Sequence, residues 1–105
     1  MNATDLEDYA AAWNAHDIER IMAYMTPDCI FETGGGSETY GTRFAGAATV
    51  RQRFIDVWTE LPDVQFRDAT HFAEGSHGCS RWTFCATRAD GSVMEVEGCD
   101  LRSWQ

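Results

Sequence analysis

One histidine and a few carboxylic acids are the side chains of this sequence best suited to moving protons. His71 lies in the middle of a strand candidate, and an imidazole with an ordinary pKa of about 6.5 suits acid–base chemistry near neutral pH. Asp100 lies beside Val96, Gly98 and Cys99 in the last strand candidate, so its carboxyl group needs an explanation if it points inward. The plainer alternatives are a histidine that only hydrogen-bonds on a sheet face and an acid that lies on the surface.

Metal chemistry has little support in the spacing of the possible ligands. The four cysteines form no C-x-x-C pair, and the three histidines form no i, i+4 pair on a helix. We therefore expect no metal and no cofactor. The N-terminus has no basic and apolar leader, so four reduced thiols in a cytoplasmic protein are the expected state.

Three helices are predicted in the first two thirds of the chain. The first opens at a capping box formed by Thr4 and Glu7, and its apolar residues recur with helical spacing up to Trp13. Asp17 is placed to cap the second helix, which ends before Pro27. The third spans residues 47–61.

Strands are predicted around and after the third helix. A short strand over 28–33 stops at three glycines, and residues 37–42 form its return strand. Residues 64–74, 79–88 and 93–104 form a meander, with a D-G turn before its last strand. Strands joined by hairpins are antiparallel, so the sequence predicts one α+β domain over residues 1–105 with helices on one face of a curved sheet.

Length and charge restrict the partners. The 105 residues suit a single domain, and 8 basic against 17 acidic residues give a formal net charge of −9. Such a domain repels the phosphates of nucleic acid and of anionic membrane surfaces, and no apolar run is long enough to span a bilayer. We expect neither nucleic acid nor a membrane as a partner. A curved sheet backed by helices suits a small apolar ligand instead.

The run from Tyr9 to Asp17, the run from Pro27 to Glu32 and the stretch from Gly98 to Leu101 together resemble the NTF2-like superfamily. Within it, the chain looks most like ketosteroid isomerases and SnoaL-like polyketide cyclases. The resemblance implies an α+β cone in which three helices of the N-terminal half pack on a strongly curved, mostly antiparallel sheet. Relatives continue past the strand of Asp100, so the resemblance also implies a sheet that lacks its last strand.

Two positions match the oxyanion hole of the isomerases. Tyr9 matches the phenol donor, and Asp100 matches a carboxylic acid that is kept protonated by an apolar site. Ketosteroid isomerase is the established example of that pair, so this chemistry belongs to the resemblance. It implies that both groups donate hydrogen bonds to a developing enolate oxygen. On the residues alone, Tyr9 is equally readable as a core aromatic.

The general base of the isomerases falls on Thr33, which cannot accept a proton at neutral pH. Glu32 is its neighbour, and a regular strand places the two on opposite faces unless the following glycines form a bulge. The alternatives for the base are therefore His71, Asp17 and Glu32, although Asp17 is also readable as a plain helix cap. Six residues are expected in a ligand pocket: Trp13, Phe31, Phe54, Trp58, Val96 and Gly98.

Two functions remain open at this stage. The first is a SnoaL-like enzyme without cofactor that abstracts a proton from a small hydrophobic carbonyl compound and stabilises the enolate. The second is a non-catalytic pocket protein that binds an apolar ligand or serves as a dimerisation module. A homodimer is expected in either case, because an open sheet edge needs a cover; Trp82, Phe84 and Trp104 could supply the contact.

Overall fold

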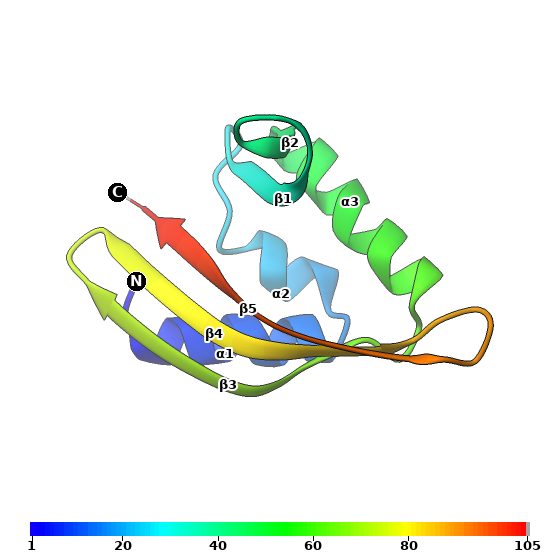
Figure 1. Cartoon of the computed structure of the whole chain (residues 1–105). Coiled ribbons are helices and arrows are strands. Elements are labelled where there is room, and N and C mark those ends of the chain that lie inside the picture. The colour runs from blue at the N-terminus through cyan, green and yellow to red at the C-terminus, as the bar shows by residue number, and fades with distance from the viewer. Residues whose placement is uncertain (105) are drawn as a thin grey trace.

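The computed structural model describes residues 1–104 and has the predicted α+β architecture, with helices on one side of a long, curved meander (Figure 1). Its elements in chain order are α1 (Ala3–Asn14), α2 (Ile18–Met22), β1 (Ile30–Glu38), β2 (Gly41–Ala45), α3 (Ala47–Glu60), β3 (Gln65–Glu74), β4 (His77–Thr87) and β5 (Val93–Ser103). Predicted and observed boundaries of α3 and of the last three strands agree within about two residues.

The start of α1 differs from the prediction. Asn2, and not Thr4, is the N-cap: its side chain accepts a hydrogen bond from the Asp5 backbone N–H at 3.0 Å, and the Asp5 carboxylate accepts one from the Asn2 backbone N–H at 2.9 Å. This is the same reciprocal motif two residues earlier, and Asn and Asp satisfy the free amides as well as Thr and Glu do. The cap of α2 is confirmed, because Asp17 accepts a hydrogen bond from the Arg20 backbone N–H at 3.2 Å.

The hairpin of β1 and β2 also differs from the prediction, because the glycines do not end the first strand. β1 continues through Gly34, Gly35 and Gly36, and the chain reverses between Glu38 and Gly41. The pairing register shifts between Thr33 and Glu38, so the extra residues are absorbed as a bulge. Glycine permits this, since a side chain on Gly41 would overlap the Thr33 carbonyl oxygen.

β3, β4 and β5 form an antiparallel meander in the order β3-β4-β5. The register of β3 and β4 shifts between Arg67 and Thr70, where Asp68 has a positive φ of 53°. This bulge keeps Phe66 and His71 on the same side of the sheet as Phe84 and Ser80, their respective partners on β4. Side chains from both halves of β3 therefore point toward the helices.

We call the side of this meander that contacts the helices its inner face. Trp13 of α1 packs on Phe66 with 4.3 Å between ring centroids, and Leu6 of α1 lies against Gly78. The tryptophans and the phenylalanine expected at a dimer contact belong to this inner face or its edge: Trp82 and Phe84 pack with Phe66, and Trp104 packs over Gly78. These three side chains make contacts within the chain, and their role in a dimer stays a prediction.

The core lies between the inner face and the three helices. Its buried members come from all three helices and from the meander, and they include Tyr9, Ala12, Trp13, Ile21, Val50, Phe54, Trp58, Val64 and Ala86. The hairpin β1–β2 is a separate two-stranded sheet beside the start of α3, and the sheet is not closed (Figure 1). Within residues 1–104, no helix combines the length and the apolar composition needed to cross a membrane.

Candidate functional site

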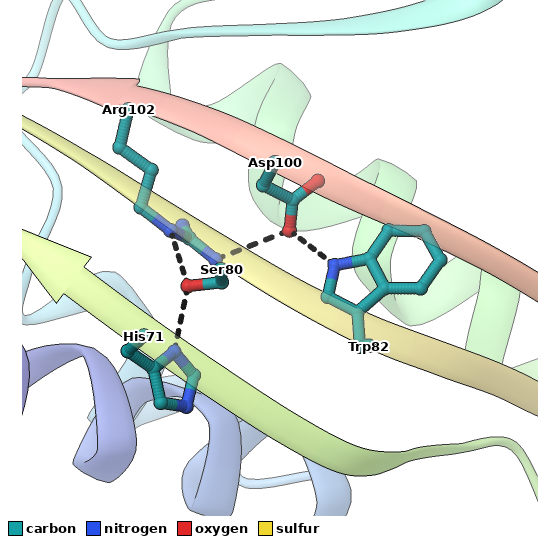
Figure 2. A network of polar contacts seen from close by, with 5 residues as sticks. All are labelled: His71, Ser80, Trp82, Asp100 and Arg102. Carbon is teal, nitrogen blue, oxygen red and sulfur yellow. Dashed lines mark hydrogen bonds and ion pairs between the residues drawn. The ribbon is translucent and has the colours of Figure 1, made fainter.

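Arg102 of β5 connects the polar side chains of the inner face (Figure 2). Its Nη2 donates to Asp100 Oδ2 at 3.2 Å, and its Nε donates to Ser80 Oγ at 3.5 Å. Its guanidinium carbon lies 4.2 Å from the ring centroid of Tyr9 on α1, a cation–π contact across the two layers. Residues 80, 100 and 102 share this face because Ser80 pairs with Asp100 across β4 and β5 and strand residues alternate.

Asp100 is held by two donors at one oxygen. Besides Arg102, the indole Nε1 of Trp82 donates to Asp100 Oδ2 at 3.1 Å. Within residues 1–104, Oδ1 of Asp100 makes no hydrogen bond, and the side chain keeps 30% of its surface exposed. Asp100 is therefore a hydrogen-bond acceptor in an ion pair, whereas the isomerase resemblance implies a protonated donor.

Gly98 explains how the Trp82 ring reaches this position. A side chain on Gly98 would lie 2.7 Å from the Trp82 ring, so only glycine lets the indole lie flat across β5. Trp82 and Gly98 face each other directly in the register of the two strands. The predicted pocket residue Gly98 thus makes room for Trp82, which in turn aims its N–H at Asp100.

His71 joins the same group from β3. Its Nδ1 lies 2.8 Å from Ser80 Oγ, and Ser80 is 2% exposed. Burial lowers the pKa of His71 below its usual value; Glu7 opposes this effect, and Arg102 adds to it. This shift favours the neutral imidazole near neutral pH, and the role of His71 as an acid–base group stays a prediction.

Tyr9 is buried at 6% exposure against the same guanidinium. Burial raises the pKa of its phenol, and the positive charge of Arg102 partly opposes that effect. The phenol is therefore protonated at neutral pH and able to donate a hydrogen bond. The structure brings Tyr9, Asp100 and His71 together around Arg102.

The other two candidate bases lie elsewhere. Asp17 is committed to the N-terminus of α2, where its carboxylate accepts the Arg20 N–H. Glu32 is exposed and forms an ion pair with Arg43 at 2.5 Å across the β1–β2 hairpin. The bulge in β1 follows Thr33, so it does not turn Glu32 toward the core.

Apart from Gly98, the predicted pocket residues fall into two groups. Trp13, Phe54 and Trp58 are buried in the core cluster, and Phe31 packs on Phe54 with 5.1 Å between ring centroids. In contrast, Val96 lies on the same side of β5 as Asp100 and is 51% exposed. The predicted pocket residues on the helices are thus packed in the core, whereas Val96 on β5 is open to solvent.

The sequence profile of the SnoaL-like domain matches residues 6–103, which is nearly the whole chain. The chain belongs to the SnoaL-like domain family. No curated protein sequence matches the chain significantly.

Solved structures with the same fold support this assignment. A candidate polyketide cyclase from Pseudomonas putida KT2440 superposes with a TM-score of 0.84 at 20% identity, over 100% of this chain and 84% of that one. TerC, co-crystallised with polyporic acid, gives 0.79 at 19% identity, over 97% and 80%. A protein from Catenulispora acidiphila with a ketosteroid isomerase-like fold, in complex with trimethylamine, gives 0.82 at 11% identity, over 100% and 78%. These TM-scores show that the SnoaL-like chain shares the fold of the three structures.

Three residues of this site were not predicted as site residues from the sequence: Ser80, Trp82 and Arg102. Arg102 lies two positions after Asp100 in the last strand, so the alternation of side chains along a strand places both on one face. The cross-strand partner of Asp100, however, depends on the β4–β5 register that the D-G turn sets, and the pairing of His71 with Ser80 depends on the bulge in β3. Together these registers place Ser80, and not its exposed neighbour Arg81, between His71 and Arg102.

This arrangement can accept and donate protons without a metal. Asp100 offers an unoccupied carboxylate oxygen, Tyr9 offers a phenol donor, and Arg102 supplies a positive charge beside both. Among residues 1–104, no three potential ligand side chains gather in a way that could hold a metal ion. Ser80 pairs with His71 and Arg102, and Asp100 Oδ2 pairs with Trp82 and Arg102, which leaves Asp100 Oδ1 free for a ligand within the described residues.

Proposed function

We propose that this SnoaL-like chain is an enzyme that abstracts a proton next to the carbonyl of a small hydrophobic compound and stabilises the resulting enolate. The observation that carries the proposal is the carboxylate of Asp100, fixed by Trp82 and Arg102 at one oxygen while the other oxygen has no partner within residues 1–104. Family neighbours bound to polyporic acid and to trimethylamine support a small-molecule ligand.

Asp100 acts as the base in this proposal. The C–H bond next to the carbonyl breaks, the proton passes to Asp100 Oδ1, and the electron pair moves onto the carbonyl oxygen. The phenol of Tyr9 donates a hydrogen bond to that oxygen, and Arg102 offsets the negative charge. In an isomerisation, the proton returns from Asp100 to a different carbon of the compound. In a cyclisation, the enolate carbon forms a bond to a second carbonyl carbon of the same compound, and the proton passes from Asp100 to the oxygen of that carbonyl. His71 and Ser80 position Arg102.

Proton exchange tests this assignment without knowledge of the natural substrate. A panel of cyclic aryl ketones is incubated with protein in D2O, and loss of the proton signal next to the carbonyl is followed by NMR. We expect Asp100→Asn to lower the exchange rate by about 100-fold or more, because an amide keeps the shape but cannot take up the proton. Asp56→Asn, an exposed carboxylate on α3, is the matched control and keeps the wild-type rate.

Two results would contradict the base assignment. Equal rates for wild type and Asp100→Asn would show that Asp100 does not take up the proton. A larger loss in His71→Gln than in Asp100→Asn would make His71 the base.

A second candidate function is a non-catalytic ligand-binding protein. The ion pair favours it, because Arg102 and Trp82 already engage one oxygen of the Asp100 carboxylate within the chain. Ketones that bind the wild-type protein with no proton exchange above the rate in buffer would select this alternative.

We also propose a homodimer, with the outer face of the meander as its contact. This face exposes Phe72 at 68% and Leu101 at 86%, beside a hollow of about 400 Å³. Its paired outward positions carry two arginines and three glutamates, so a second copy meets far less repulsion here than the charge of −9 suggests. Leu101→Glu should convert a dimer to a monomer in sedimentation analysis; a wild-type monomer at micromolar concentration contradicts the proposal.

The four cysteines support a cytoplasmic location. Cys29, Cys79, Cys85 and Cys99 are all free thiols, as a reducing compartment maintains them. Cell fractionation with an antibody to the native chain tests this, and recovery outside the cytoplasmic fraction would contradict it.

A further inference from the structure

Two of the free thiols lie close together on the outer face of the meander. Cys79 of β4 is paired with Leu101 of β5. Cys99 is paired with Arg81, two positions further along both strands, so the two cysteines are diagonal neighbours across β4 and β5. Because side chains alternate along a strand, Cys99 points away from its neighbour Asp100 and from the helices. The pair is therefore separate from the polar site of the inner face.

The two sulfur atoms are near enough to interact. Burial raises the pKa of the Cys79 thiol above its usual value, and the charge of Cys99 and a hydrogen bond with its sulfur raise this pKa further. Cys79 is half-buried, whereas Cys99 is exposed. The side-chain interaction and the strand register thus agree that the thiols form a pair.

The diagonal arrangement suits an ion between the sulfurs better than a disulfide bond. Diagonal partners in an antiparallel sheet have Cα atoms about 7–8 Å apart, whereas a disulfide needs at most about 6.8 Å and a sulfur–sulfur bond of about 2.05 Å. A metal–sulfur bond is about 2.3 Å long, as it is for zinc, so one ion can join two sulfurs that are about 4.6 Å apart. The ion therefore requires less movement of the backbone.

The number and kind of ligands select the ion. Among residues 1–104, no three histidine, cysteine, aspartate or glutamate side chains gather into a metal-binding group, so the site consists of two sulfurs. Zinc in proteins takes four ligands, and calcium and magnesium take six or more oxygens. Cu(I) is a soft ion that prefers sulfur, and its filled d shell permits linear coordination by two ligands. The ligand set thus fits Cu(I).

A hollow in the outer face gives the ion access to the less exposed sulfur. Cys79 lines the hollow of about 400 Å³ together with its two cross-strand neighbours, Phe72 and Leu101. Both neighbours are exposed apolar side chains, so they leave the ion no competing ligand. An entry path is one requirement of a metal site, and this hollow supplies it.

Arg81 supplies a positive charge beside the more exposed sulfur. It lies directly opposite Cys99 in the register, and its ion pair with Glu97 is long, at 3.9 Å, with both side chains exposed. An ion held by two thiolates has one excess negative charge. A guanidinium next to one of the sulfurs stabilises that charge in a chain that is otherwise strongly acidic.

We propose that Cys79 and Cys99 bind one Cu(I) ion between their sulfur atoms. Each thiol releases its proton and forms one sulfur–copper bond, so the oxidation state of copper does not change. A reducing compartment, such as the proposed cytoplasmic location, maintains both free thiols and Cu(I). The spacing of the cysteines in the sequence gave no sign of this site, because the two residues meet only through the register of β4 and β5.

The test measures Cu(I) binding to the whole chain without oxygen, with ferrozine as the competing chelator. We expect one Cu(I) per wild-type chain. Cys79→Ser and Cys99→Ser should each weaken binding by about 100-fold or more, because a second ligand on the same framework adds at least this much to the affinity of the first. Cys29→Ser removes a free thiol elsewhere in the chain and should keep the wild-type affinity.

X-ray absorption at the copper edge checks the ligands and should show two sulfur neighbours. Wild-type affinity in either Cys79→Ser or Cys99→Ser would overturn the site, and so would an equal loss in Cys29→Ser. Circular dichroism of each metal-free variant shows whether it folds. Cys99→Ser keeps the test decisive if Cys79→Ser unfolds, because the side chain of Cys99 is exposed.

Two further variants separate this proposal from the others. Cys99→Ser should keep the proton exchange of the ketones, and Asp100→Asn should keep Cu(I) binding, because the two sites lie on opposite faces of the sheet. Leu101→Glu, which should disrupt the proposed dimer, should still bind one Cu(I) per chain. One ion shared by two wild-type chains, or binding lost in a folded Leu101→Glu variant, would place the ion between copies and overturn a site within one chain.

Discussion

Polar groups are buried in different ways at the two ends of the interior between the helices and the meander. At one end, Asp100, Arg102 and Ser80 satisfy one another and enlist Trp82 as a donor. At the other end, Trp13 and Trp58 pack as rings, and the N–H of Trp58 stays without an acceptor. The first end pairs its polar groups within the chain apart from Asp100 Oδ1, whereas the second leaves its one indole donor without an acceptor among residues 1–104.

Phe66 joins the two ends, since its ring packs on Trp13 and on Trp82. Its backbone is fixed by the amide of Asn14, which donates to the Phe66 carbonyl at 2.9 Å and accepts from the Phe66 N–H at 2.8 Å. A single side chain of α1 therefore sets where the aromatic row begins on β3. Changes at Asn14, at Gly98 and at His71 test how far the two ends are independent.

The largest effect is expected from Asn14→Ala, which acts on both ends at once. It leaves the N–H and C=O of Phe66 without their partners, which should lower the free energy of unfolding by about 3 kcal/mol. Urea unfolding followed by tryptophan fluorescence measures this loss. Gln52→Ala, which removes an exposed amide on α3, should cost less than about 0.5 kcal/mol. Equal losses would show that Asn14 does not hold β3.

A smaller effect is expected from Gly98→Ala, which acts on the polar end alone. The added methyl group would lie 2.7 Å from the Trp82 ring and displace the indole from Asp100, at a cost of about 2 kcal/mol. Gly34→Ala is the control, because nothing lies within 4 Å of a side chain there. In ¹⁵N spectra the Trp82 indole signal should move while that of Trp58 stays. Movement of both would mean that the two ends are mechanically coupled.

The smallest effect is a pH dependence that belongs to the polar end. Because burial lowers the pKa of His71, the unfolded chain binds a proton more readily than the folded one. The stability tied to neutral His71 is complete above the unfolded pKa of about 6.5 and is lost as the pH falls below it. Unfolding at about pH 7.5 and about pH 5.5 should show a smaller loss on acidification in His71→Gln than in wild type. An unchanged loss would contradict the burial of this imidazole.

Several parts of the fold and the site follow from local chemistry. The cap at Asp17, the apolar stripe of α1 and the D-G turn before β5 each specify a nearby backbone conformation, and the structure has all three. Strand alternation places Asp100 and Arg102 on one face without further information. The start of α1 and the path of β1 were predicted less well, because competing caps and glycine-rich strands leave several local solutions of similar energy.

The sequence by itself determined the order of helices and strands, the acidic charge and which residues share a face. It did not determine that Arg102 would neutralise Asp100 and cover Tyr9, that Trp82 would turn inward over Gly98, or that Trp58 would be left unpaired. Those outcomes depend on cross-strand register, on the bulge in β3 and on the packing of α1 and α3 against the sheet. Contacts between residues distant in sequence have no local signal, because their energies exist only after the chain has brought them together.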